Sequence, residues 1–206
     1  MDHIFLHKGD LPSSVQFGDV IAVDTETMGL NLQRDPICLV QLSSGDGTAH
    51  IVQLDRFGGY NCPNLKALME DPAHLKLFHF ARFDVAMMMQ HLQVLCAPVW
   101  CTKIASKLVR TYTDRHGLKE VSRELAGVDM SKAQQSSDWG AETLSEAQLR
   151  YAASDVLHLH KIKDALTRML EREERMELAE ACFDFLPVRA SLDLAGWPDT
   201  DIFAHS

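Results

Sequence analysis

The sequence predicts an α/β fold, in which helices flank a mixed β-sheet, and a single domain that spans residues 1–206. Short runs of apolar and β-branched residues alternate along the chain with segments whose apolar residues recur at helical spacing. A length of 206 residues and a hydrophobic content of 46% are enough for one domain to form its own core. The pattern requires no second domain.

Five short segments are predicted to be strands, because they are rich in apolar and β-branched residues and are bounded by turn-forming residues. In chain order they are Val20–Val23, Ile37–Ser43, Thr48–Leu54, Leu75–His79 and Val99–Cys101. A Ser-Gly-Asp-Gly turn joins the second segment to the third, so the first three are expected to form a meander. The fourth is expected to be a buried strand that runs directly into a helix.

The segments between and after the strands are predicted to be helical. They are Asn64–Met69, Ala81–His91, Thr102–Val109, Gly117–Leu125 and a long pattern from Ser145 onward. The first ends before Asp71-Pro72, because a proline disfavours a helical residue before it, and Thr102 is placed to cap the third. Apolar residues at helical spacing in the long pattern are interpreted as core positions. They are Leu149, Ala152, Val156, Leu159, Ile162, Leu166, Met169 and Leu170.

Residues 127–140, between the last two helical segments, are polar except for Met130 and Trp139. A polar connection of this length is a candidate for a mobile functional loop. Lys132, Gln135 and Trp139 either fix this loop in place or belong to a loop that closes over a substrate. The charged run Glu171–Glu177 is expected to be a solvated helix face.

Composition limits the possible partners and sites. A net charge of −9 argues against a long basic track, because nonspecific affinity for nucleic acid comes mainly from neutralised phosphates. It does not exclude a nuclease, since bound divalent cations would cancel several charges.

The five cysteines contain no Cys-x-x-Cys pair, which disfavours a disulfide framework and a zinc site. The sequence has neither a signal-peptide pattern nor an apolar run of about 20 residues. We therefore expect a soluble cytoplasmic protein that does not enter the membrane.

Four carboxylates stand where the predicted elements can bring them together: Asp24, Glu26, Asp84 and Asp155. Asp24 and Glu26 are two residues apart at the end of a strand and share one face of the sheet, whereas Thr25 points away. Tyr151 and Asp155 are four residues apart on a helix and lie on one side of it. Hard divalent cations require such oxygen ligands, and two cations would support hydrolysis of a phosphodiester.

Each of these residues has a plainer interpretation by itself. Asp24 is then a turn acid, Glu26 a surface charge, Asp84 a solvated helix residue and Tyr151 a residue at the edge of the core. Their joint order and spacing favour a metal site over these alternatives. Two divalent cations, Mg²⁺ or Mn²⁺, are therefore predicted. Tyr151 is expected to orient the attacking water, because an unperturbed phenol has a pKa of about 10.

The motifs Asp24-x-Glu26, His79-Phe-Ala-Arg-Phe-Asp84 and Tyr151-x-x-x-Asp155 resemble those of the DEDDy branch of the 3′-to-5′ exonuclease superfamily, which has a ribonuclease-H-like fold. The stretches Gly117–Glu120, Gln135–Trp139 and Leu144–Tyr151 are similar to ribonuclease D. The resemblance spans residues 20–161, and residues 162–206 would form a C-terminal helix and tail. Because no helical nucleic-acid-binding domain follows, the sequence is most similar to the compact, oligoribonuclease-like nano-RNase C group.

This resemblance implies an exonuclease that releases nucleoside 5′-monophosphates from 3′ ends, mainly of very short RNAs that include dinucleotides. The metal ligands would be Asp24, Glu26, Asp84 and Asp155, with Tyr151 positioning the water. The substrate contacts would be Thr25, Leu30, His79 and Arg82. Leu30 would act as a wedge between bases, its alternative being a loop residue with a buried side chain. Two residues depart from the family pattern, since Phe80 replaces the usual Asn and Cys101 a frequent Asp.

Other functions stay open at this point. They are an exonuclease that acts on DNA or longer RNA, an inactive nucleic-acid-binding module with the same fold, and an interaction protein with an incidental metal site.

The apolar tail residues Trp197, Ile202 and Phe203 predict that the tail packs on another surface, either that of its own domain or that of a second copy. The resemblance implies a closed homo-oligomer such as an octameric ring.

Overall fold

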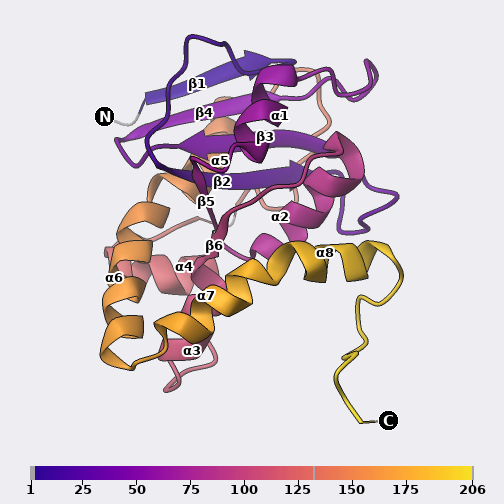
Figure 1. Ribbon diagram of the computed structural model, residues 1–206. Helices are drawn as coiled ribbons and strands as arrows, with labels where there is room; N and C mark the ends of the chain where they lie inside the picture. The colour runs from indigo at the N-terminus through magenta and orange to yellow at the C-terminus, as the bar shows by residue number, and fades with distance from the viewer. Residues whose placement is uncertain (1–2, 132, 206) are drawn as a thin grey trace.

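A computed structural model describes residues 3–131 and 133–205 and is built around a six-stranded sheet (Figure 1). The strands are β1 (His3–Lys8), β2 (Val20–Thr27), β3 (Ile37–Ser43), β4 (Thr48–Gln53), β5 (Leu75–Phe78) and β6 (Val99–Cys101). Their order in the sheet is β1-β4-β3-β2-β5-β6. The β2–β3 and β3–β4 pairs are antiparallel, and the β1–β4, β2–β5 and β5–β6 pairs are parallel. The predicted mixed sheet is therefore confirmed.

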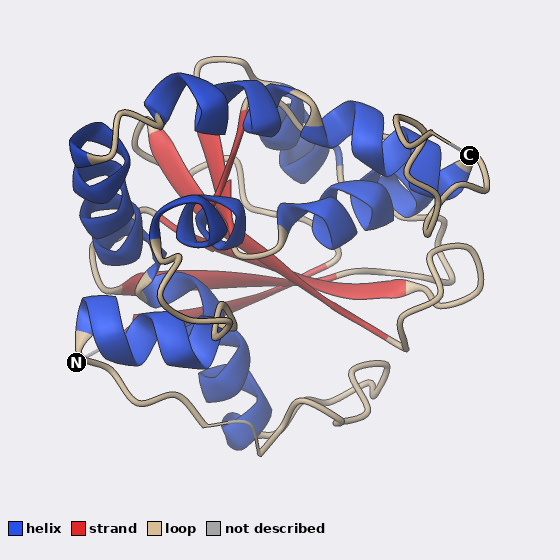
Figure 2. Cartoon of the chain, turned by 90° about the horizontal axis from the view of Figure 1, so that it is seen from below, coloured by secondary structure: helices blue, strands red, loops and turns tan. Residues whose placement is uncertain are grey.

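Helices lie on both sides of the sheet (Figure 2). They are α1 (Pro63–Glu70), α2 (Ala81–Met87), α3 (Thr102–Val109), α4 (Leu118–Val121), α5 (Glu146–Leu157), α6 (Leu159–Arg172), α7 (Met176–Asp184) and α8 (Leu186–Leu194). Two short π-helical segments, η1 (Met88–Leu92) and η2 (Ser122–Ala126), continue α2 and α4. Helix α5 packs across β2, β3 and β4, whereas α2 packs against α8. Every residue of β3 is buried between these layers.

Most predicted elements are confirmed, and β3 and β6 have the predicted bounds. Two findings differ from the expectations. Strand β1 was not predicted, because its partner β4 lies far along the chain and its own residues alternate between exposed and half-buried. Thr102 is not the N-cap of α3, because Cys101 occupies that position and the Thr102 hydroxyl instead donates to the carbonyl of Phe78 at 3.2 Å.

Strand order places the carboxyl ends of β2 and β5 at one edge of the sheet, because these two strands are parallel neighbours. Helix α2 begins immediately after β5, so its first turn lies near the end of β2. Helix α5 starts with a capping box in which the Ser145 hydroxyl accepts from the backbone N–H of Gln148 at 3.2 Å. These three elements define the position of the candidate site.

The described residues contain no helix that is both long enough and apolar enough to cross a bilayer. All five cysteines are free thiols. Four of them are buried, namely Cys38, Cys62, Cys96 and Cys101, and Cys182 is partly exposed.

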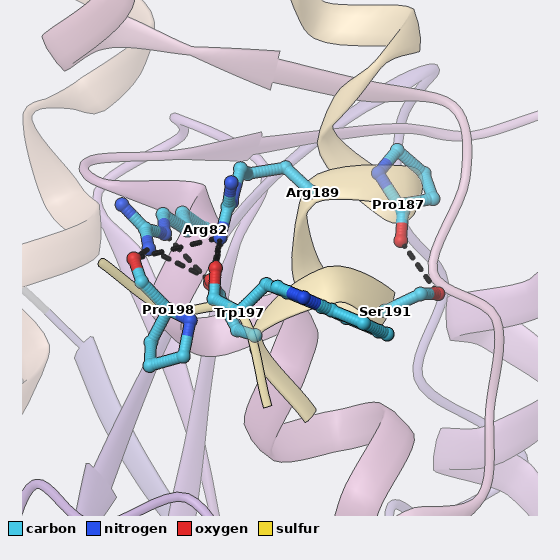
Figure 3. Close-up of polar contacts among 7 residues, drawn as sticks. Arg82, Pro187, Arg189, Ser191, Trp197 and Pro198 are labelled. Carbon is cyan, nitrogen blue, oxygen red and sulfur yellow. Dashed lines mark hydrogen bonds and ion pairs between the residues drawn. The ribbon is translucent and has the colours of Figure 1, made fainter. Parts of the chain in front are cut away.

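The C-terminal segment docks on α2 through two arginines that share one carboxylate (Figure 3). Arg82 of α2 donates to Asp193 of α8 at 2.6 and 2.7 Å and to the carbonyl of Pro198 at 2.5 Å. Arg189 of α8 donates to Asp193 at 3.1 and 2.5 Å and also to the carbonyl of Trp197. The Asp193 side chain is only 4% exposed, so this buried carboxylate is fully occupied by the two guanidiniums.

Part of the tail nevertheless keeps apolar surface in contact with solvent. The Phe203 ring lies 6.1 Å from the ring of Phe185, yet Phe203 is 78% exposed. Trp197 and Ile202 are 47% and 46% exposed. The tail thus docks on its own domain at the arginine pair and leaves apolar side chains free for a further surface.

We expect Asp193→Asn to lower the free energy of unfolding by about 2 kcal/mol, because two guanidiniums lose their charged partner in a partly buried setting. Urea unfolding followed by circular dichroism measures this change. The matched control is Glu146→Gln, whose partner Arg150 forms an exposed pair, with side chains 78% and 70% exposed. It should change stability by less than about 0.5 kcal/mol. Equal effects of the two substitutions would contradict the interpretation of the arginine pair.

Candidate active site

Three carboxylates converge at the end of β2. Asp24 and Glu26 project from the same face of β2, as their spacing predicts, and Asp155 reaches them from α5. One ligand oxygen from each of these residues lies within 4.8 Å of the others. All three side chains are half-buried and line one cavity. The structure thus brings together residues that are up to 131 positions apart.

Helix α5 holds Asp155 and Tyr151 toward the sheet because its opposite side chains are packed in the core. Ala152, Ala153 and Val156 are completely buried. Tyr151 and Asp155 lie one turn apart and both line the cavity. The Trp139 ring, buried at 3% exposure, lies 5.9 Å from the Tyr151 ring and packs against it. The Trp139 contact therefore restricts the orientation of the phenol.

Asp84 of α2 is the most buried of the four carboxylates, at 4% exposure, and it lies outside the group of three whose oxygens are within 4.8 Å and does not line the cavity. Its Oδ1 accepts a hydrogen bond from the Thr25 hydroxyl at 2.7 Å. Thr25 points away from Asp24 and Glu26, as its position in the strand predicts, and in doing so it reaches Asp84. This link was not predicted, because nothing in the sequence states how α2 lies against β2.

Burial raises the pKa values of all four carboxylates, and neighbouring carboxylates raise three of them further. Burial, followed by repulsion from Asp24, Asp155 and Asp84, raises the pKa of Glu26 to about 10. Burial raises the pKa of Asp24 to about 7, although the backbone N–H of Thr25 opposes the shift. Burial and the charge of Asp24 also raise the pKa values of Asp84 and Asp155. Within residues 3–131 and 133–205, none of the four forms an ion pair with a basic side chain.

A cavity of about 670 Å³ opens over this cluster, a volume typical of a small-ligand site. Leu30 stands at its mouth with 83% of its surface exposed, so the alternative of a buried loop residue is wrong. The basic side chains among the described lining residues are Lys103, Lys119 and His79. The cavity therefore combines an acidic floor with few positive charges on its walls.

His79 lines the cavity as a neutral imidazole. Its Nδ1 lies 2.8 Å from the hydroxyl of Thr102, and its buried Nε2 has no hydrogen-bond partner within the described part of the chain. Burial lowers the pKa of His79 to about 3, and the charge of Lys103 lowers it further. One ring nitrogen is thus available to a ligand and carries no net charge at neutral pH.

Phe80 adopts a left-handed backbone conformation at the N-cap of α2, with φ of 69°. Asparagine tolerates this region much better than a bulky aromatic residue, which explains why Asn usually occupies the position in the resembling motif. The Phe80 ring is 43% exposed at the cavity wall, and the ammonium of Lys103 lies 4.0 Å from its centre. This cation–π contact offsets part of the backbone strain.

One further expectation, for Arg82, meets a different geometry, whereas two residues of the polar connection lie where a loop beside the site would place them. Arg82 does not line the cavity, because its guanidinium is engaged by Asp193 and Pro198, so the structure gives it a docking contact in place of the phosphate contact expected from the sequence. Gln135 and Trp139 of the polar connection both line the cavity. Lys132 lies outside the described residues.

Comparison with known proteins places this geometry among nucleases. A family model described as 3′-5′ exonuclease matches residues 9–171. Ribonuclease D of Gluconacetobacter diazotrophicus is 35% identical over 158 residues, which are 76% of this chain and 39% of that protein. The chain therefore spans about two fifths of the length of the curated relatives that it matches, including ribonuclease D of Acidiphilium cryptum, of which it covers 39%.

Solved structures of Brucella melitensis NrnC match the whole chain more closely. NrnC with bound Mg²⁺ is 54% identical, with a TM-score of 0.93 that covers 99% of this chain and 100% of that one. NrnC bound to pGG is 55% identical, with a TM-score of 0.94 that covers 100% of both chains. The match includes all the elements that carry the carboxylate cluster. The ribonuclease-H-like exonuclease fold expected from the motifs is thereby confirmed.

The raised pKa of Glu26 predicts how stability depends on pH. Between the ordinary pKa of about 4.5 and the folded value of about 10, folded Glu26 keeps a proton that the unfolded chain releases. The metal-free protein should therefore lose stability as the pH rises through this window. Stabilisation by Mg²⁺ should instead grow with pH, because cations bind deprotonated carboxylates.

Thermal unfolding in a chelator and in millimolar Mg²⁺, at several pH values between about 6 and 9, measures both trends. Glu26→Gln is the control, because it should flatten much of the dependence of the metal-free protein. An Mg²⁺-induced rise in the unfolding midpoint that is the same at every pH would contradict the interpretation.

Proposed function

Because this chain belongs to the 3′-5′ exonuclease family, we propose that it removes nucleoside 5′-monophosphates from the 3′ ends of very short RNA strands, including dinucleotides. The observation that carries the proposal is the convergence of Asp24, Glu26 and Asp155 within 4.8 Å on the floor of a substrate-sized cavity. Two structures of one relative support it, since NrnC has been solved with Mg²⁺ and bound to pGG.

The donor set fits divalent cations. It consists of carboxylate oxygens, its members repel one another, and no basic side chain of the described chain neutralises them. Hard cations prefer such oxygen ligands. We assign Asp24, Glu26, Asp84 and Asp155 as the ligands of two cations, Mg²⁺ or Mn²⁺. When bound, these would lower the pKa of an attacking water and stabilise the charge that develops on the leaving 3′ oxygen.

Tyr151 would orient the attacking water without taking its proton. Burial, together with the charges of Asp155, Glu26 and Asp24, raises the pKa of the phenol above its ordinary value. The hydroxyl therefore keeps its proton at neutral pH and both donates and accepts hydrogen bonds. Its place one turn from Asp155, packed against Trp139, holds it beside the proposed metal ligands.

The remaining side chains would bind and orient the substrate. The Thr102 hydroxyl donates to Phe78, so His79 donates from Nδ1 to Thr102 and offers Nε2 as an acceptor to a hydroxyl of the terminal nucleotide. Leu30, exposed at the mouth of the cavity, would insert between the last two bases. Thr25 would act through the hydrogen bond that orients Asp84, because its hydroxyl is already engaged. We assign Arg82 no substrate contact in this proposal.

We also propose that the protein works as a homo-oligomer in the cytoplasm. The exposed tail residues Trp197, Ile202 and Phe203 supply apolar surface for contacts between copies. The five free thiols are compatible with a reducing compartment. A closed ring such as an octamer, suggested by the family resemblance, would restrict access of long strands to the active sites.

Loss of any one metal ligand should lower turnover of an RNA dinucleotide by at least about a hundredfold, the scale of a large electrostatic catalytic effect. The variants are Asp24→Asn, Asp84→Asn and Asp155→Asn, assayed in saturating Mg²⁺ by resolving the nucleotides released. Each should remain folded, because the substitution removes a repelling charge. Tyr151→Phe should be milder, since it leaves the ligands intact. Near-normal turnover by Asp155→Asn would overturn the assignment.

Short substrates should compete well with long ones. Affinity for a polymer grows with the number of neutralised phosphates, and this protein combines a net charge of −9 with few basic residues at its cavity. We expect kcat/KM for a dinucleotide to equal or exceed that for a single strand of twenty residues, with Leu30→Ala narrowing the difference. Parallel RNA and DNA series distinguish the two polymers. A tenfold preference for the long strand at physiological salt would favour a general exonuclease.

Light scattering at micromolar concentration should report an assembly larger than a monomer. Substituting the exposed Trp197 and Phe203 together by serine should shift the protein toward smaller species, because both residues contribute apolar surface to the tail. Exposed Leu178 on α7 provides a control at a different place, and Leu178→Ser should leave the mass unchanged. A monomeric wild-type protein would reject the proposed assembly.

A further inference from the structure

A buried glutamine lies beside the carboxylate cluster and has no role in the function described so far. Gln41 in β3 is the register partner of Asp24 in the antiparallel β2–β3 pair. Directly opposed residues of such a pair project from the same face of the sheet, with Cβ atoms about 5 Å apart. Gln41 and Asp24 thus share the face on which α5 and the cluster lie.

The Gln41 amide is completely buried and unsatisfied. Its exposure is 0%, and among the residues that the structure describes neither Nε2 nor Oε1 has a hydrogen-bond partner. A buried amide without a partner costs free energy that an apolar side chain of the same length would not. The position therefore retains a polar group where the packing of the core favours an apolar one.

The other residues around Gln41 do not explain this polar group. Its partner on β4 is the apolar residue Ile51. On the same face of β3, Leu39 is apolar, and the hydroxyl of Ser43 already donates to the carbonyl of Thr48 at 2.7 Å. Asp24 is the charged group that the strand register sets opposite the amide.

We infer that Gln41 is a positioning residue that donates an amide N–H to the carboxylate of Asp24 when the proposed metal site is loaded. A hydrogen bond from outside the ligand set fixes the orientation of a metal-binding carboxylate. An amide is suited to this task because it is a neutral donor. A lysine or arginine in its place would cancel the charge that attracts the cations. This inference rests on the proposed function, since it requires Asp24 to be a ligand.

Gln41→Met tests the inference, because it keeps the length of the side chain and removes only the amide. The unfolding midpoint of the metal-free protein should stay the same or rise, since no hydrogen bond is lost. The Mg²⁺-induced rise in the midpoint should shrink, and the Mg²⁺ concentration that gives half-maximal dinucleotide hydrolysis should increase about 10- to 100-fold. KM for the dinucleotide at saturating Mg²⁺ should change little.

Thr167→Val is the matched control, because the Thr167 hydroxyl on α6 is also buried without a partner among the described residues but is not set opposite a proposed metal ligand as Gln41 is. It should leave both Mg²⁺ responses unchanged. Asp24→Asn separates the two levels of the argument. If wild type and Asp24→Asn respond equally to Mg²⁺, the proposed function fails, whereas a normal Mg²⁺ response in Gln41→Met overturns only the role of Gln41.

If Gln41 served only to stabilise the fold, the unfolding measurements would give a different result. Gln41→Met would then lower the metal-free midpoint or fail to fold, and either outcome overturns the inference. A crystal structure of the wild-type protein with Mg²⁺ provides a test that needs no variant. We expect Nε2 of Gln41 within about 3 Å of an Asp24 carboxylate oxygen. A separation beyond about 4 Å would reject the hydrogen bond.

Discussion

Repulsion among four carboxylates is the constraint that the rest of the structure has to support. Charges in a partly buried site interact more strongly than in water. Burial raises the pKa of each of these groups, and repulsion from neighbouring carboxylates raises the pKa values of Glu26, Asp84 and Asp155 further. Free side chains would move apart. Here they cannot, because β2 is paired with a strand on each side and α5 is fixed by fully buried alanines. The packing of the core thus holds a cluster that cations can then stabilise.

The cluster is assembled from both faces of the sheet. Asp24, Glu26 and Asp155 meet on the face covered by α5, whereas Asp84 is reached by Thr25 from the other side of the strand. Alternation along β2 therefore serves two purposes, because successive residues supply a ligand and a hydrogen bond to a ligand. The same logic applies across the strand pair, where the register sets Gln41 opposite Asp24.

Local periodicity predicted which carboxylates of one element share a face, and Asp24, Glu26 and Asp155 do converge. Asp24 and Glu26 share a strand face, and Tyr151 and Asp155 a helix face, because these spacings follow from backbone geometry alone. Contacts between distant elements were not predictable in this way. We expected Arg82 to contact a phosphate of the substrate, but its guanidinium binds Asp193, which is 111 residues away in the sequence. Strand β1, the Thr25–Asp84 bond and the hydroxyl of Thr102 likewise depend on how separate elements pack, which no local pattern encodes.

Helix α2 carries two attachments within its first turn. Arg82 receives the C-terminal segment, and Asp84, two residues later, belongs to the carboxylate cluster. A displacement of α8 is therefore transmitted to Asp84 through a short, rigid stretch of backbone. Evolutionary or laboratory selection for altered turnover should accordingly recover substitutions on α8 and in the tail, far from any bound nucleotide. Drift of the tail sequence is thus constrained by catalysis as well as by stability.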